Sequence, residues 1–273
     1  MQLLRLLTTG SMLFLLTGCF QITTVVRVNP DGSGTVEESM LLSKKIFGEI
    51  NQMMQGFAGK SGEKPKQLEL FEPAKLKEQA RDMGAGVNYR SGKKVETADY
   101  TGYTATYAFT DINNLKLTRN SGNLTGATKS ASLPLIFHCD KGSPATLTIV
   151  QARTKTAGKP ADDPGTEPAA PADAQPKMSD AETRKFMEMF MGMKFVLAVE
   201  VNGTIVSTNA THRNGKRLTL VDLDLARIGT AGPELEKLSR LKNSSFEEAK
   251  ELFKGIPGIR MDLNDKLIVV FKK

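Results

Sequence analysis

Apolar and polar residues alternate along several stretches of the chain, and this pattern predicts β-strands with one buried face. Phe20, Ile22, Thr24, Val26 and Val28 lie on one face of the first such stretch. A group of turn-forming residues at 29–34 follows it, and Val36, Met40 and Leu42 then mark a returning strand. The same pattern predicts further strands at 87–95, 103–109, 115–117, 133–139 and 145–152.

Two Asn-Gly pairs divide a later alternating region into three parts. The apolar runs cover 195–201, 204–211 and 218–223, with Asn202-Gly203 and Asn214-Gly215 between them. Because Asn-Gly suits a type I′ hairpin turn, this spacing predicts a three-stranded antiparallel meander. At the end of the chain, 259–263 and 267–271 flank Asn264-Asp265 and predict a terminal hairpin.

Apolar residues at helical spacing predict amphipathic helices between these strands. Ser43 is suited to cap the first helix, and Pro73 to begin a second helix that ends at Gly84. A capping box begins at Ser179, and two short helices are expected near 233–241 and 245–255. The first helix has the apolar stripe Ile46, Phe47, Ile50, Met53, Met54 and Phe57, and the helix after Ser179 has Phe186, Met187, Phe190, Met191 and Met193.

Strands and helices do not alternate regularly, so the expected class is α+β, mostly antiparallel sheet with several short amphipathic helices packed on it. A stretch rich in Pro and Ala, 153–178, lacks large apolar residues and predicts a disordered linker or loop. It separates an N-terminal α+β lobe, 19–152, from a C-terminal α+β lobe, 179–273. The alternative is that both lobes form one domain.

The first residues are typical of a signal peptide, predicted to span 1–18. Arg5 precedes the apolar run Leu6–Leu16, which is too short to span a bilayer. Leu16-Thr17-Gly18-Cys19 resembles the lipobox of bacterial lipoproteins, which implies cleavage after Gly18 and acylation of Cys19. The alternative is an ordinary secretory signal. Phe20 stands where an Asp would favour retention at the inner membrane, so we expect an outer-membrane anchor facing the periplasm.

Composition narrows the chemistry further. The net charge is +7, but basic residues are interspersed with acidic ones, which argues against a nucleic-acid partner. With one of two cysteines predicted to be acylated, Cys139 has no disulfide partner and is expected to be buried. Of the two histidines, His138 points away from Cys139 in a strand and His212 precedes a turn, so neither predicts a metal site. No cofactor is predicted.

Only one pair of side chains offers a candidate for catalysis. Asp222 and Asp224 share a face at the end of a strand, a pattern compatible with a hydrolase, although polar strand ends are also ordinary structure. No nucleophile motif, phosphate-binding loop or dinucleotide fingerprint accompanies them. We therefore predict that the protein is not an enzyme.

Two groups of apolar side chains are candidates for lining a ligand pocket. Met187, Phe190 and Met191 belong to the Met-rich helix, where thioethers either fill the core, line an adaptable pocket or bind copper(I). Tyr103 and Tyr107 lie on one strand face, as an aromatic platform for a ligand or as part of a buried sheet.

The chain resembles the LppM-like group of bacterial envelope lipoproteins. The resemblance rests on the lipobox Cys19 followed by a strand and the 29–34 turn, on the hairpin 199–209, and on the strand 218–222. It implies an α+β domain in the cell envelope, a membrane contact through the lipid on Cys19, and binding of lipid-like ligands. We expect a non-catalytic module that binds an apolar ligand or an envelope protein. The alternatives are an envelope hydrolase using Asp222 and Asp224, and a structural spacer in a larger assembly.

Overall fold

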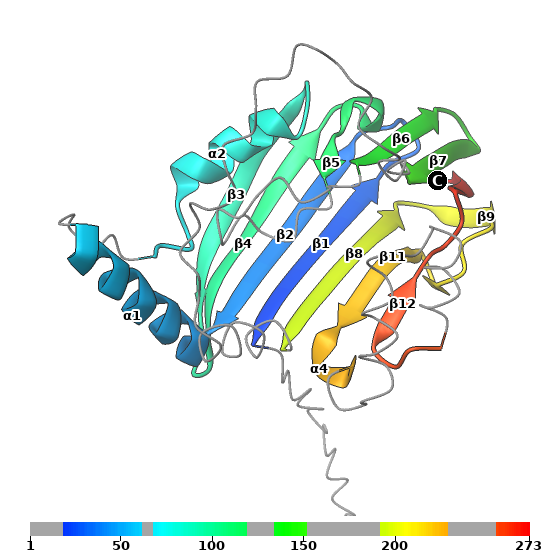
Figure 1. Cartoon of the computed structure of the whole chain (residues 1–273). Coiled ribbons are helices and arrows are strands. Elements are labelled where there is room, and N and C mark those ends of the chain that lie inside the picture. Colours follow the sequence, from blue (N-terminus) through cyan, green and yellow to red (C-terminus); the bar gives the residue numbers. More distant parts are fainter. Residues whose placement is uncertain (1–18, 62–67, 119–133, 152–191, 229–254) are drawn as a thin grey trace, which may run out of the picture.

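The computed structural model describes residues 19–61, 68–118, 134–151, 192–228 and 255–273. Figure 1 shows a large twisted sheet with a smaller sheet at one end. The larger sheet contains, in spatial order, β10 (Arg213–Asn214), β11 (Arg217–Asp224), β8 (Met193–Val201), β1 (Phe20–Val28), β2 (Gly34–Ser43), β4 (Tyr100–Phe109) and β3 (Val87–Glu96), with β12 (Ile259–Met261) also on β11. The smaller sheet contains β5 (Leu117–Thr118), β6 (Pro134–Asp140), β7 (Ala145–Gln151), β13 (Lys266–Lys272) and β9 (Thr204–Thr208).

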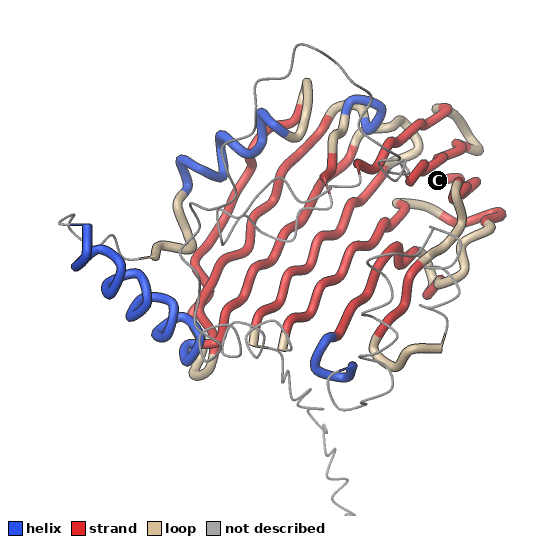
Figure 2. Tube along the Cα trace, viewed as in Figure 1, coloured by secondary structure: helices blue, strands red, loops and turns tan. Residues whose placement is uncertain are grey.

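The helices lie at the margins of the larger sheet (Figure 2). They are α1 (Lys44–Ser61), α2 (Pro73–Asp82), α4 (Leu225–Ile228) and the 3-10 helix η1 (Ile112–Asn114). The Ser43 hydroxyl accepts a hydrogen bond from the Ile46 amide at 3.3 Å, which confirms the predicted cap of α1. Pro73 begins α2, and Gly84 follows its end with a φ of 122°, a value that glycine adopts most easily.

Most strand pairs are antiparallel, and the expected α+β class is confirmed. The exception is β1, which pairs in parallel with β8 over its whole length. Both sheets combine strands from either side of the predicted linker, since β1 neighbours β8 and β7 neighbours β13. The linker itself, 153–178, lies outside the described residues.

Residues of both sheets and of α2 form the main hydrophobic core, and Ile256 and Ile259 form a second, small cluster. Alternation decides which side chains enter the main core: on β13, Leu267, Val269 and Phe271 are fully buried, whereas Ile268 is 40% exposed. Tyr107 on β4 is also fully buried, below α2.

The predicted meander over 195–223 is wrong in its middle strand. β8 pairs directly with β11, while β9 leaves the larger sheet and pairs with β13. Gly203 lacks the positive φ that a type I′ turn requires. The backbone N–H of Asn202 instead donates a hydrogen bond to the Val28 carbonyl. The tertiary contact of Ile205 with the core therefore overrides the local turn preference. The second turn is confirmed, with Gly215 at a φ of 58° between β10 and β11.

The predicted terminal hairpin is also wrong, because its two strands belong to different sheets. β12 pairs with β11, and β13 pairs with β7 and β9. The fully buried Asp262 between them accepts hydrogen bonds from the backbone amides of Thr211 and Asn264. These bonds hold the crossing between the sheets, so the chain does not fold back on itself there.

Two smaller expectations also change. Met193 begins β8 and does not belong to the apolar face of a helix, because it pairs with Phe20 in the larger sheet. The strand expected at 115–117 starts only at Leu117, since η1 and its turn occupy the preceding residues.

Candidate functional site

Cys19 lies at one end of the larger sheet, directly before β1. Its carbonyl accepts a hydrogen bond from the Ser43 amide at 2.8 Å, so the start of α1 lies beside it. Gly192 packs against the Cys19 side chain, and a Cβ at position 192 would lie 2.6 Å from Sγ. The chain before Cys19 lies outside the described residues, so its cleavage and the acylation of Cys19 stay predictions.

A groove of about 650 Å³ lies near this end of the sheet, between α1 and the strands β3 and β4. Apolar side chains from α1 and from the segment before α2 form much of its wall: Phe47, Leu68, Leu70 and Phe71. Thr101 and Gly102 of β4 also line the groove. The Leu68 amide donates to Asn51 Oδ1 at 2.9 Å, which ties this segment to α1. The volume is in the range of pockets that take small ligands.

The lining of the groove carries two lysines, Lys44 and Lys94, and two glutamates, Glu69 and Glu96. Glu96 Oε1 lies 3.0 Å from Lys44 Nζ, and Glu96 Oε2 lies 3.4 Å from Lys94 Nζ. The hydrogen bond from Lys44 holds the pKa of the Glu96 carboxyl below its ordinary value. Two ammonium groups thus share the Glu96 carboxylate, and with Glu69 the formal charges of the lining balance beside its apolar wall.

The strand register shows that the groove and Cys19 lie at the same end of the larger sheet. Phe20, next to Cys19, pairs with Leu42, which pairs with Thr101, and Thr101 pairs with Glu96. Three strand spacings separate β1 from β3, which is about 14 Å.

Tyr103 and Tyr107, two predicted ligand-lining residues, are buried in the sheet below the groove and α2. Tyr103 is 7% exposed, and its ring centroid lies 6.5 Å from that of Phe71 in the groove wall. Its hydroxyl donates to Glu38 Oε1, and Gln79 Nε2 of α2 donates to Glu38 Oε2. The Tyr107 hydroxyl donates to Gln79 Oε1 at 3.3 Å. Burial raises the pKa of both phenols, so both hydroxyls keep their protons, and the network anchors α2 and supports the buried-sheet alternative.

The other candidate residues do not form a shared site within the described part of the chain. Met187, Phe190 and Met191 lie outside the described residues. Asp222 forms an ion pair with Arg260, and Asp224 Oδ2 lies 3.7 Å from Arg227 Nε, so each carboxylate has its own cation.

Cys139 is 4% exposed and His138 points to the opposite face of β6, as predicted. His212 is half-buried. Among the described residues, no group of three or more His, Cys, Asp or Glu side chains is arranged to hold a metal ion. Within the same residues, no helix combines the length and apolar character needed to cross a bilayer.

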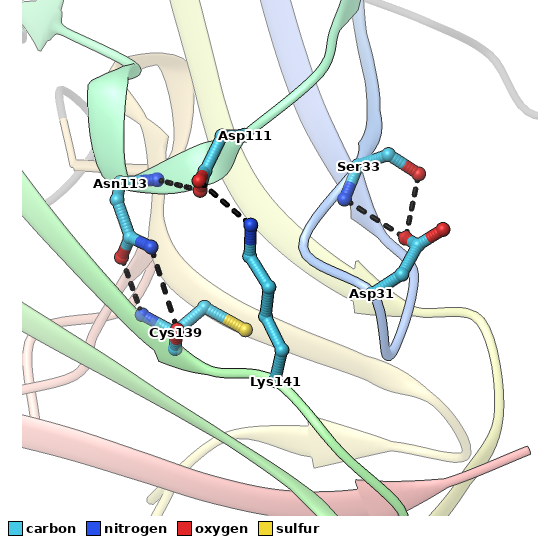
Figure 3. Close-up of polar contacts among 6 residues, drawn as sticks. All are labelled: Asp31, Ser33, Asp111, Asn113, Cys139 and Lys141. Carbon is cyan, nitrogen blue, oxygen red and sulfur yellow. Dashed lines mark hydrogen bonds and ion pairs between the residues drawn. The ribbon is translucent and has the colours of Figure 1, made fainter.

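A polar cluster joins three turns at the far end of the sheet (Figure 3). The Asp111 carboxylate accepts a hydrogen bond from the backbone N–H of Asn113 at 3.0 Å and forms an ion pair with Lys141 Nζ at 2.8 Å. Asn113 Oδ1 accepts from the Cys139 amide at 2.7 Å. Asp31 accepts from the amide and hydroxyl of Ser33 within the neighbouring β1–β2 turn. Burial raises the pKa of the Cys139 thiol, so the cluster is a structural corner between the sheets with no activated thiol.

We expect acid to destabilise the fold through these carboxylates. The hydrogen bond from Lys141 lowers the pKa of Asp111, that from Ser33 lowers the pKa of Asp31, and that from Lys44 lowers the pKa of Glu96. A carboxyl whose folded pKa is depressed stabilises the fold above its unfolded pKa, about 4, and loses this contribution as pH falls through the folded pKa. Urea denaturation between pH 6 and pH 2.5 should therefore show a falling free energy of unfolding below about pH 4.

Asp111→Asn should reduce the steepness of this fall, because the neutral amide cannot titrate. Asp82→Asn, at the exposed end of α2, is the matched control and should leave the steepness unchanged. An Asp111→Asn variant with the full pH dependence of the unmodified protein would contradict the assignment.

The groove was not predicted from the sequence. Its wall combines one residue of the predicted stripe, Phe47, with Leu68, Leu70 and Phe71, which lie between two predicted helices. The signal for them is three apolar residues within four positions shortly before Pro73, in a region otherwise assigned to a connection. The side chains of Met53 and Phe57 lie outside the described ones.

No family model matches the chain, and no curated protein matches its sequence. Among solved structures, the chain is similar to the folded domain of the LppM protein of Mycobacterium tuberculosis, determined by NMR. The identity is 10%, the match covers 96% of this chain and 95% of that chain, and the TM-score is 0.31. This is a distant resemblance of fold, and at this TM-score it carries no inference about ligand, partner or cellular location.

Proposed function

We propose that this chain is a lipid-anchored protein of the bacterial cell envelope that binds an amphipathic, lipid-like ligand in the α1 groove and catalyses no reaction. The observation that carries the proposal is the position of the groove, at the end of the sheet where Cys19 lies. A lipid on Cys19 would hold this end against a bilayer, preferably the periplasmic face of an outer membrane. Three strand spacings, about 14 Å, separate β1, which follows Cys19, from β3, which lines the groove.

The chemistry of the groove supports a ligand with an apolar body and a polar head. Phe47, Leu70 and Phe71 offer apolar surface, whose burial against an acyl chain contributes roughly 25 cal/mol per Å². Lys44 and Lys94 at the rim offer charge-assisted hydrogen bonds to a carboxylate or phosphate.

The proposal assigns no catalysis to the carboxylates that the sequence singled out. Asp222 and Asp224 each pair with an arginine, Arg260 and Arg227, and both lie on β11 away from the groove-lining strands β3 and β4.

The binding experiment uses the full chain with Cys19→Ser and lysophosphatidylglycerol, a single-chain anionic lipid, below its micellar concentration. We expect saturable binding by calorimetry. Leu70→Asp should weaken it by about tenfold or more, because a charge in the apolar wall must lose its hydration when the acyl chain binds. Ile268→Asp is the matched control, since Ile268 is 40% exposed on the smaller sheet. The proposal would be refuted if the Leu70→Asp variant bound lysophosphatidylglycerol as tightly as the protein with Leu70, or if neither protein bound it.

A further inference from the structure

A second hollow, of about 690 Å³, lies at the opposite end of the larger sheet from Cys19. The strand register defines this end, because Val28 pairs with Gly34, Gly34 with Phe109, and Phe109 with Val87. We call this hollow the distal cup. Its lining includes the polar residues Asn29, Ser33, Asn88, Arg90 and Asn202.

The polar groups on one side of the distal cup are held in place by a chain of hydrogen bonds. Asn202 Nδ2 donates to Asn29 Oδ1 at 2.8 Å, and Asn29 Nδ2 donates to Ser33 Oγ at 2.9 Å. The Ser33 hydroxyl in turn donates to Asp31 Oδ1 at 2.7 Å. Side chains fixed in this way lose little conformational entropy when a ligand binds, so the cup is preorganised for a polar ligand.

Arg90 is presented to the distal cup by an irregularity in the sheet. The register of β3 against β4 shifts between Tyr89 and Ser91, so Arg90 is the extra residue of a β-bulge. Such bulges redirect a side chain and are frequent beside functional sites. Arg90 is exposed, and within the described part of the chain no carboxylate pairs with it. The described lining of the cup therefore carries one formal charge among amides and hydroxyls.

We propose that the distal cup binds an oligosaccharide that bears a carboxylate. Sugar hydroxyls both donate and accept hydrogen bonds, and so do the amide and hydroxyl side chains that line the cup. The register pairs Tyr89 with the fully buried Tyr107 and Asn88 with Ala108, so the Tyr89 ring faces the core and the polar side chains of the cup make the contacts with the sugar. The carboxylate of the ligand pairs with the planar guanidinium of Arg90 in two parallel hydrogen bonds.

The lining disfavours other classes of ligand. A nucleic acid needs several cations along its backbone, and the described lining has one. A lipid or apolar peptide needs a largely apolar wall, whereas three amides face this cup. This inference is independent of the proposed lipid binding in the α1 groove, because the two sites lie at opposite ends of the sheet.

The test uses the full chain in nanodiscs, titrated with tetragalacturonic acid, with maltotetraose as the neutral comparison. We expect the acidic tetrasaccharide to bind, and the neutral one to bind at least about tenfold more weakly. Arg90→Gln should remove this preference, and Asn88→Ala should weaken both ligands. Arg81→Gln, which removes an exposed arginine from α2, is the matched control and should change neither affinity.

Three results would overturn the proposal. They are the absence of binding by either tetrasaccharide, equal affinity for the two, and an acid preference that survives Arg90→Gln. Binding of inorganic phosphate at Arg90 with no binding of either tetrasaccharide would show a simple anion contact and would also overturn it. None of these results bears on lysophosphatidylglycerol binding in the α1 groove.

Discussion

Replacing Cys19 with serine is expected to move the protein from the membrane fraction to the soluble fraction. The lipobox predicts acyl chains on the Cys19 sulfur, and each buried methylene contributes about 0.8 kcal/mol of membrane affinity. Two or three chains make attachment stable, and a serine hydroxyl cannot form the thioether on which attachment depends. Cell fractionation followed by intact-mass analysis measures both the location and the mass of the lipid.

Cys139→Ala is the matched control for this experiment. Cys139 is buried in β6 and carries no predicted lipid, so the variant should stay in the membrane fraction with its full added mass. An unmodified Cys19 thiol in the mature protein would contradict the anchor, and with it the placement of the α1 groove beside a bilayer. Membrane attachment that survives Cys19→Ser would contradict it equally.

Phe271→Ala is expected to lower the free energy of unfolding by about 3–5 kcal/mol, the usual cost of removing a fully buried phenylalanine side chain. Phe271 lies on β13, between Ala145 of β7 and Ile205 of β9, and fills the core that the two sheets share. The cavity left by alanine cannot close without movement of both sheets. Urea denaturation at neutral pH measures the loss.

Ile268→Ala provides the comparison from the same strand. Ile268 is 40% exposed and faces away from the core, so its truncation should cost less than about 1 kcal/mol. Similar losses for the two variants would mean that β13 does not present Phe271 inward, and would contradict the assigned register of the smaller sheet.

Local patterns were sufficient to predict most of the individual elements. The alternation of β1 and β4, the Ser43 cap of α1 and the Pro73 start of α2 all depend on residues close together in the chain. The exposure of His138 beside a buried Cys139 follows from the same period of two. Tyr103 and Tyr107 were correctly placed on one face, but the sequence left open whether that face is buried.

Pairing between distant strands was beyond the reach of local patterns. Asn202-Gly203 has the composition of a hairpin turn, yet Asn202 bonds to Val28 and Asn29, and the following strand enters the other sheet. No signal near residue 202 encodes that choice, because it depends on the space beside β13. The α1 groove escaped prediction for the same reason, since Phe47, Phe71 and Lys94 come from three separate elements.

The sequence by itself determined the predicted anchor at Cys19, the α+β class and which side chains share a face of a strand, because these depend on motifs and periods within a few residues. Only the tertiary structure decided which strands are neighbours, that β8 lies parallel to β1, and that a groove and a polar cup lie at opposite ends of one sheet. The physical reason is that the hydrophobic effect is non-directional and stabilises any arrangement that covers the apolar faces. The arrangement adopted is selected by contacts among residues far apart in the chain.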